Sequence, residues 1–242
     1  MIDLLLIVAI LPIILLGKYI YNKDKNKEPN SLLIKLFISG IFSCLLTLAV
    51  TTIFSILFPF INKDPTTMNF IEFSLYVFIF IALIEECLKW VMTYLIGYKS
   101  KEFDEVYDII VYATFTALGF ATFENLLYVF GTGSLGVGIF RGILAIPGHV
   151  CDGIAMGYYL SFARYYELAG NKKEARKNKI KSILIPTILH GIYDYCCLTG
   201  TTLIMICFLV FIIFLYITSI KKVKILAEET IKMRNNSSYD KI

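Results

Sequence analysis

The chain is poor in charged residues and has no polar stretch long enough to form a soluble domain. Asp, Glu, Lys and Arg together make up 17% of its 242 residues, whereas 57% are hydrophobic. We find no internal repeat. This composition is far more apolar than that of an ordinary soluble domain. It therefore predicts a polytopic membrane protein organised as a single integral membrane domain over residues 1–242.

Neither a disulfide framework nor a nucleic-acid interface is expected. All six cysteines fall inside apolar segments, where they are interpreted as small apolar residues. The net charge is +4, but the Lys and Arg residues lie mainly in short loops between apolar segments. The sequence thus predicts contact with membrane lipids and no nucleic-acid partner, and it does not specify an oligomeric state.

Seven segments are long enough to cross a membrane, which takes about 20 apolar residues per helix. Their approximate limits are 2–21, 32–60, 70–97, 108–130, 137–166, 181–198 and 201–220, with a tail at 221–242. The first segment lacks a basic leading region and a small-residue cleavage pattern, so we expect an uncleaved anchor. The fold class predicted is an all-α membrane helix bundle of about seven transmembrane helices.

The distribution of basic residues predicts the orientation of this bundle. Lys and Arg gather in the connections after the first, third and fifth segments and in the tail. The other connections contain only one basic residue, Lys63. Because basic loops stay on the cytoplasmic side, we expect an N-terminus outside the cell and a C-terminus, with its tail, in the cytoplasm.

Three charged residues interrupt the third apolar segment. Glu85 and Glu86 are adjacent, and Lys89 follows one helical turn later. Spacings of three and four residues allow Lys89 to contact either carboxylate. Charge at membrane depth costs a few kcal/mol per residue on insertion scales, so such residues are functional by default.

Three further segments carry ionisable or aromatic polar groups at similar depth. They are Glu124 and Tyr128 in the fourth segment, Arg141, His149 and Asp152 in the fifth, and His190 and Asp194 in the sixth. Both histidines of the chain have an aspartate one turn away that could fix the ring orientation. A histidine held by a carboxylate is common in acid–base catalysis and around metals. We therefore expect one shared polar cavity.

Simpler interpretations exist for some members of this set. A single Glu–Lys pair can be a packing device between helices. Tyr128 can be an interfacial aromatic residue, Arg141 can pair with a lipid phosphate, and Asp152 can lie near water on a helix broken at Pro147. Packing accidents do not readily explain both histidines and three glutamates together.

The expected chemistry of such a cavity is the activation of water. Two adjacent carboxylates can supply one base and one proton holder. The histidines can polarise a carbonyl, stabilise an oxyanion or pass a proton to a leaving amine.

The order and spacing of these motifs resemble the PrsW family of intramembrane proteases, which looks related to the larger group of CAAX-processing and bacteriocin-processing proteases. The motifs are Glu85-Glu86-x-x-Lys89, Phe123-Glu124-x-x-x-Tyr128, a histidine at 149, and His190-Gly191-x-x-Asp194. They cover about half of the chain. Two positions depart from the larger group, which has an arginine one residue after position 89 and an asparagine at position 194. The first departure favours PrsW over prenyl-protein processing.

The resemblance implies a membrane-embedded endopeptidase of a bacterial cell membrane. It implies the first, extracytoplasmic (site-1) cut in a single-span, membrane-anchored anti-sigma factor, which leads to sigma-factor release in envelope stress. It also implies glutamate-dependent hydrolysis with no obligatory metal or other cofactor.

Residue roles follow from the same resemblance. Glu85 is the preferred base, with Glu86 nearly as good a candidate, and Lys89 would hold the pair. The remaining catalytic candidates are Glu124 and His149 at the water site, His190 at the scissile carbonyl, and Asp194, which either touches substrate or orients His190. The candidates for substrate binding are Tyr128, Arg141 and Asp152.

Two alternatives stay open at this point. Zinc accepts His and carboxylate ligands, so a zinc metalloprotease could use Glu85, Glu124, His149 and His190, although no established zinc spacing such as His-Glu-x-x-His occurs. Buried carboxylates and His–Asp pairs also suit a proton-coupled transporter, although transporters often contain repeats.

Overall fold

The structure is a computed structural model that describes the backbone of residues 2–235 and the side chains of residues 3–230. Met1 and residues 236–242, the end of the predicted tail, lie outside this described part. All regular elements within it are helical. In chain order they are α1 (Ile2–Lys23), α2 (Asn30–Leu57), η1 (Pro59–Asn62), η2 (Pro65–Thr67), α3 (Phe70–Leu75), η3 (Tyr76–Leu83), α4 (Ile84–Met92), η4 (Thr93–Tyr98), α5 (Asp108–Thr132), α6 (Leu135–Ile143), α7 (Ala145–Leu168), α8 (Lys172–Thr199) and α9 (Thr202–Asn235).

The predicted all-α membrane fold is confirmed. Each predicted segment is largely helical, and five helical runs in the described part are long and apolar enough to cross a membrane. The number of spans and the side on which each terminus lies stay predictions. Two boundaries differ from expectation. α8 begins at Lys172 and not near residue 181, and α9 continues without a break to Asn235, so residues 221–235 extend the last helix.

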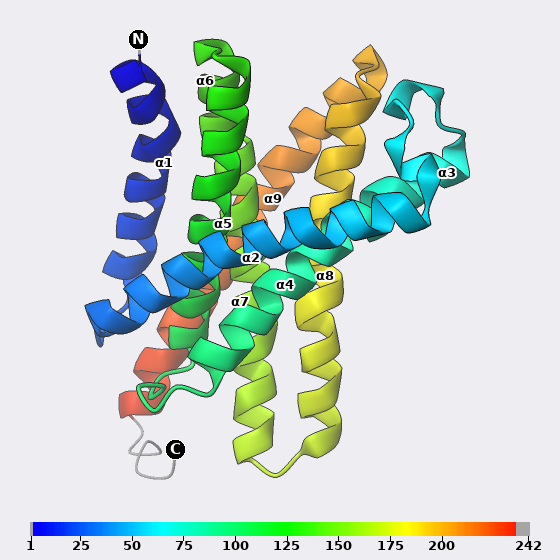
Figure 1. Ribbon diagram of the computed structural model, residues 1–242. Helices are drawn as coiled ribbons and strands as arrows, with labels where there is room; N and C mark the ends of the chain where they lie inside the picture. The colour runs from blue at the N-terminus through cyan, green and yellow to red at the C-terminus, as the bar shows by residue number, and fades with distance from the viewer. Residues whose placement is uncertain (1, 236–242) are drawn as a thin grey trace.

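The helices form a bundle in which α5 and α7 occupy the interior. α5 packs against α1, α2 and α7, and α7 also packs against α8 and α9. α2 crosses the others obliquely, and the start of α1 and the end of α9 lie at opposite ends of the molecule (Figure 1). The hairpin between α7 and α8, which carries basic residues, lies at the same end as the end of α9 (Figure 1).

The fifth predicted segment is divided into α6 and α7 by a break at Leu144. Pro147 explains the break, because its ring has no N–H for the carbonyl oxygen of Ile143 and clashes with that carbonyl in a regular helix. The hydroxyl of Tyr216 on α9 donates to this oxygen at 2.8 Å instead. The break therefore lies three residues before the proline, just ahead of the turn that carries His149.

The third predicted segment is helical throughout but changes its winding twice. The π-helical segments η3 and η4 flank the α-helical turns of α4, which carry Glu85, Glu86 and Lys89. π-Helical turns occur mainly at functional sites, because they rotate the side chains that follow. All three charged residues of α4 are buried.

Close packing of α2 against α5 depends on two glycines. A Cβ atom at Gly40 would lie 2.0 Å from the carbonyl oxygen of Thr116, and one at Gly119 would lie 1.9 Å from that of Phe37. Small residues at such crossings let helix backbones approach in membranes. These two helices border the groove described below.

We expect Gly119→Ala to destabilise the protein, because the added methyl group must push α2 and α5 apart. Overpacking of this kind costs about 1–3 kcal/mol. Gly131→Ala is the matched control on the same helix, since a Cβ there meets nothing within 4 Å. Thermal unfolding of the purified protein in detergent checks the prediction, and equal melting temperatures for wild type and Gly119→Ala would refute it.

Candidate active site

Four helical segments bring the predicted polar residues together in the interior of the bundle. α4 supplies Glu85, Glu86 and Lys89, α5 supplies Glu124, α7 supplies His149 and Asp152, and α8 supplies His190 and Asp194. The contacts described below link all of them into one cluster. The expected convergence is therefore observed, and the individual roles stay predictions.

Lys89 lies at the centre of the cluster and is almost fully buried. Its Nζ donates to Oε1 of Glu86 at 2.6 Å and to Nδ1 of His149 at 3.2 Å. The ammonium group also lies 4.0 Å from the centroid of the Phe120 ring, in a cation–π contact. A buried lysine with these partners fixes the spacing between α4, α5 and α7.

The two adjacent glutamates differ in how completely they are bonded. Oε1 of Glu86 accepts from both Lys89 and His190, at 2.6 and 2.9 Å, and its side chain has no exposed surface. Oε2 of Glu85 accepts no hydrogen bond, and its nearest charged partners are Lys89 Nζ at 3.5 Å and His190 Nε2 at 3.7 Å. Oε2 of Glu86 also accepts no hydrogen bond. The two residues differ because Glu86 is tied down through Oε1, whereas Glu85 has only these longer ion pairs.

Both ring nitrogens of His190 face carboxylates. Nδ1 lies 2.9 Å from Oε1 of Glu86, and Nε2 lies 3.2 Å from Oδ2 of Asp194. Because a carboxylate only accepts hydrogen bonds, this arrangement favours a ring that carries a proton on each nitrogen. His190 is thereby held as a donor beside Glu85.

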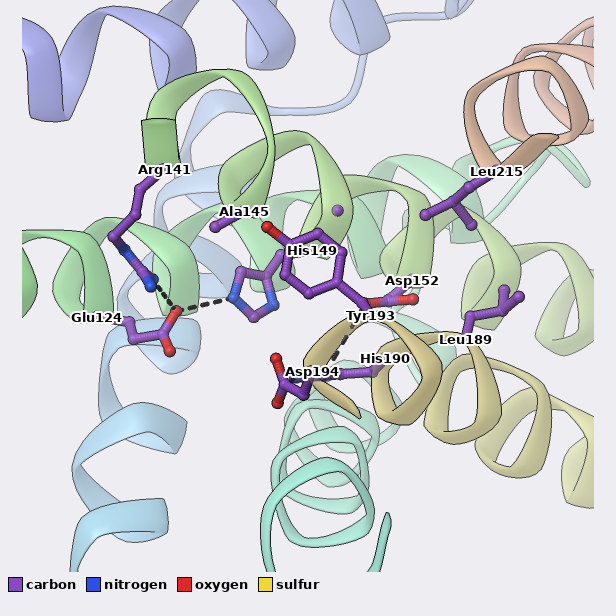
Figure 2. Close-up of a pocket in the computed structure, with 11 residues that line it drawn as sticks. Glu124, Arg141, Ala145, His149, Asp152, Leu189, His190, Tyr193, Asp194 and Leu215 are labelled. Carbon is purple, nitrogen blue, oxygen red and sulfur yellow. Dashed lines mark hydrogen bonds and ion pairs between the residues drawn. The ribbon is translucent and has the colours of Figure 1, made fainter. Parts of the chain in front are cut away.

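His149 is held by different partners. Its Nδ1 accepts from Lys89, which leaves the proton on Nε2, and Nε2 donates to Oε2 of Glu124 at 2.8 Å. Arg141 donates to the same glutamate oxygen at 2.7 Å, as Figure 2 shows. The orienting carboxylate of His149 is therefore Glu124, and not Asp152 as the one-turn spacing suggested.

The three candidates for substrate binding lie around this cluster. Asp152 is buried beside His190, with Oδ2 3.9 Å from Nδ1. The guanidinium of Arg141 lies 3.9 Å over the ring of Tyr128, which is half-exposed. Arg141 thus belongs to the site through Glu124.

Sequence reasoning did not assign roles to two contributors to the site. Asn125 is fully buried, accepts from Nε of Arg141 at 3.2 Å and donates to the carbonyl of Ala9 on α1. Phe120 lies under the Lys89 ammonium. Only weak sequence signals point to these two residues. Asn125 is adjacent to Glu124, and Phe120 lies one helical turn before Glu124.

Two cavities meet at Glu124. The first is a small cavity of about 30 Å³, enough for about one water molecule, lined mainly by α5, α7 and α8. His149, Asp152, His190 and Asp194 line it (Figure 2). The second is a groove of about 550 Å³ between α2, η3 and α5, and Glu85 and Glu124 both line it.

One wall of this groove is polar. Thr47, Thr51, Thr52 and Ser55 of α2 line it. Their hydroxyl groups donate to carbonyl oxygens of their own helix, as Thr51 does to Thr47 at 2.8 Å. Each hydroxyl oxygen therefore keeps the capacity to accept a hydrogen bond.

Four of the clustered residues have the donor chemistry of a metal site. Single ligand atoms of Glu86, His149, Asp152 and His190 lie within 4.8 Å of one another, and so do those of a second set, Glu85, Glu124 and His149. Zinc binds this combination of imidazole and carboxylate ligands. However, the Lys89 ammonium is bonded directly to two of the four, Glu86 and His149.

Known proteins are similar to the chain over most of its length. The sequence profile described as "PrsW family intramembrane metalloprotease" matches residues 28–218. The curated relatives include "Protease PrsW" of Oceanobacillus iheyensis, 37% identical over 92% of this chain and 96% of the relative. The proteins of the same name from Clostridioides difficile and Bacillus subtilis are 34% and 33% identical, over 91% and 89% of this chain and 90% and 92% of their own. No solved structure matches the chain significantly.

Proposed function

The chain belongs to the PrsW family of membrane proteases, and on that premise we propose that this multi-pass bacterial membrane protease hydrolyses peptide bonds with Glu85 as the base. The observation that carries the proposal is the unequal bonding of the two glutamates. Oε1 of Glu86 accepts hydrogen bonds from Lys89 and His190, whereas Glu85 contacts the same two residues only at 3.5 and 3.7 Å and lines the groove. The protease relatives favour hydrolysis over the transporter alternative.

In this mechanism Glu85 takes a proton from water and directs the water at the scissile carbonyl. The Nδ1 proton of His190 stays hydrogen-bonded to Glu86, and the Nε2 proton is shared between Asp194 and the developing oxyanion. The proton on Glu85 then passes to the leaving amine. Lys89 keeps the Glu86 carboxylate charged and in place.

Glu124 lines the groove together with Glu85, and His149 lines the adjoining small cavity. Glu124 accepts from His149 and Arg141, and it lines both cavities. We assign it to hold the attacking water against Glu85. Tyr128 lines the groove, and Arg141, whose guanidinium lies over the Tyr128 ring, lines the small cavity. Both would contact the substrate there.

A catalytic metal fits this arrangement poorly. The donor types suit zinc, but the Lys89 ammonium forms hydrogen bonds to Glu86 and His149 in the first set. In the second set it bonds to His149 and lies 3.5 Å from Glu85. A divalent cation in the same place would meet a like charge within a few ångströms. We therefore derive no step through a metal, although the family description calls its members metalloproteases.

The proposed substrate is a single-span, membrane-anchored anti-sigma factor, cut near its extracytoplasmic side. A helix must unwind before its peptide bonds can be attacked, and its free N–H groups then need partners inside the membrane. The hydroxyl groups of α2 could accept from them along the groove. The connection at 58–69 beside the groove lies toward the same end as the N-terminus (Figure 1), which we predict to be outside.

Co-expression with candidate single-span anti-sigma factors tests this function. We expect wild type to release a truncated substrate, and Glu85→Ala, Glu86→Ala and His190→Ala to leave it intact. Cleavage by all three variants at the wild-type rate would exclude the proposed protease site. An uncut anti-sigma factor, with cleavage of other membrane proteins, would exclude only the substrate.

We expect Thr51→Trp to reduce cleavage at least tenfold, because the indole would occupy the groove beside its polar wall. The matched control is Ile53→Trp on the same helix, since Ile53 is 57% exposed on the outer surface of the bundle. Both variants should reach the membrane in equal amounts. Equal cleavage by Thr51→Trp and Ile53→Trp would place the substrate path elsewhere.

A further inference from the structure

A second group of acidic residues lies apart from the active site, where the α1–α2 connection meets the start of α5. Asp24 and Glu28 belong to that connection, Asp104 and Glu105 precede α5, and Asp108 is its first residue. Carboxylate oxygens of Asp24, Glu105 and Asp108 lie within 4.8 Å of one another, and so do those of Glu28, Asp104 and Asp108. Asp108 joins the two sets.

Two of these side chains are buried with oxygens that accept no hydrogen bond. Asp24 is 3% exposed, and neither of its carboxylate oxygens has a partner. Asp108 is fully buried; its Oδ2 accepts from the backbone of Asp104 and Glu105, but its Oδ1 has no partner. A buried carboxylate oxygen without a partner is costly.

The neighbouring hydrogen-bond donors bond to other atoms and not to these oxygens of Asp24 and Asp108. Nζ of Lys27 donates to the backbone carbonyl oxygens of Tyr21 and Asp24. The hydroxyl of Tyr112 donates to Glu28 at 2.7 Å, and the side chain of Asn26 donates to Asp104 at 2.7 Å. Unpartnered oxygens of Asp24 and Asp108 thus remain in the middle of five acidic side chains.

We propose that this acidic cluster binds a divalent cation of the hard, oxygen-preferring class, Mg²⁺ or Ca²⁺. Its ligands are Asp24, Glu105 and Asp108, with Glu28 and Asp104 adding negative charge around them. All candidate ligands are carboxylates, and the cluster contains no histidine or cysteine, a donor set that selects Mg²⁺ and Ca²⁺ over zinc. The bound cation joins the α1–α2 connection to the start of α5, the helix that carries Glu124.

Thermal unfolding of the full-length protein in detergent tests this site. After removal of divalent ions, MgCl₂ and CaCl₂ are added separately. A ligand that binds only the folded state raises the melting temperature, by about 5 °C at a hundredfold excess over its Kd. We expect this increase in wild type with at least one of the two ions, and isothermal titration should give one site per chain.

Asp24→Asn and Asp108→Asn should both fold and lose the increase, because they keep the shape of the site and remove its charge. Glu105→Gln is a further variant if either is unstable. Asp64→Asn, an exposed acid in a different connection, and Glu85→Gln in the active site should keep the full increase. The proposal is wrong if neither ion stabilises wild type, or if Asp24→Asn and Asp108→Asn are stabilised as much as wild type. Loss of the increase in Glu85→Gln would also overturn it, by assigning the cation to the active site.

Discussion

Glu85→Gln is expected to reduce substrate cleavage by about 10²–10⁴-fold, the usual contribution of a general base. Glutamine fills the same space and can still hydrogen-bond, but it cannot take a proton from water. Oε2 of Glu85 accepts no hydrogen bond in the structure, so the substitution removes only the longer ion pairs with Lys89 at 3.5 Å and His190 at 3.7 Å. The release of truncated substrate, normalised to the amount of protease in the membrane, gives the effect.

Glu72→Gln is the control for this prediction. Glu72 is an acid of α3 that pairs with Lys63 outside the cluster. The Glu72→Gln variant should therefore leave cleavage unchanged.

Glu86→Gln should reduce cleavage and also lower the melting temperature, since Glu86 anchors both Lys89 and His190. Wild-type cleavage by Glu85→Gln, combined with complete loss in a stably folded Glu86→Gln, would reverse the assignment of the base.

Lys89→Met should be the most destabilising single substitution in the site. It leaves Glu86 charged, buried and without its closest cation, a loss that costs about 3–5 kcal/mol for a buried pair. The chain also loses the bond from Lys89 to His149 and the contact with Phe120. We expect a strongly reduced yield of folded protein and a lower melting temperature.

The double variant Lys89→Met/Glu86→Gln separates structure from chemistry. Removing both charges should recover most of the stability, because no uncompensated ion stays buried. The double variant should remain inactive, since His190 loses the carboxylate on its Nδ1 side. If the double variant cleaves like wild type, the Glu–Lys pair is only a packing device between helices.

Hydropathy and the energetic cost of buried charge were sufficient to predict much of this molecule. The apolar segments predicted the helices, and the anomalous position of Glu85, Glu86 and Lys89 predicted a polar interior. Convergence of α4, α5, α7 and α8 followed from residues at similar depth. Each of these inferences uses only the hydropathy of one segment and the position of its charged residues.

Partner choice inside the site was not predictable in the same way. One-turn spacing paired His149 with Asp152, but the structure pairs His149 with Glu124 on another helix and places Asp152 near His190. Helix rotation decides such pairings, and the π-helical segments that flank α4 have no signature that periodicity detects. The same holds for Asn125, whose partners come from α1 and α6.

The distinction between Glu85 and Glu86 also required the structure. Adjacent residues on a helix point in directions about 100° apart, so the two carboxylates have different surroundings. In the structure Glu86 faces Lys89 and His190, and Glu85 faces the groove along α2. Because the two side chains are identical and adjacent, the sequence does not indicate which of them lines the groove.

Cleavage by metal-stripped protein is the most direct test of the central claim that buried carboxylates hydrolyse the peptide bond without a metal. The purified protease would be treated with 1,10-phenanthroline in the presence of Mg²⁺, its zinc content measured, and its activity followed on a single-span substrate in proteoliposomes. The account predicts that zinc-free protein cleaves at the untreated rate and that Glu85→Gln does not cleave. Activity that disappears with a stoichiometric zinc ion and returns when zinc is restored would contradict it.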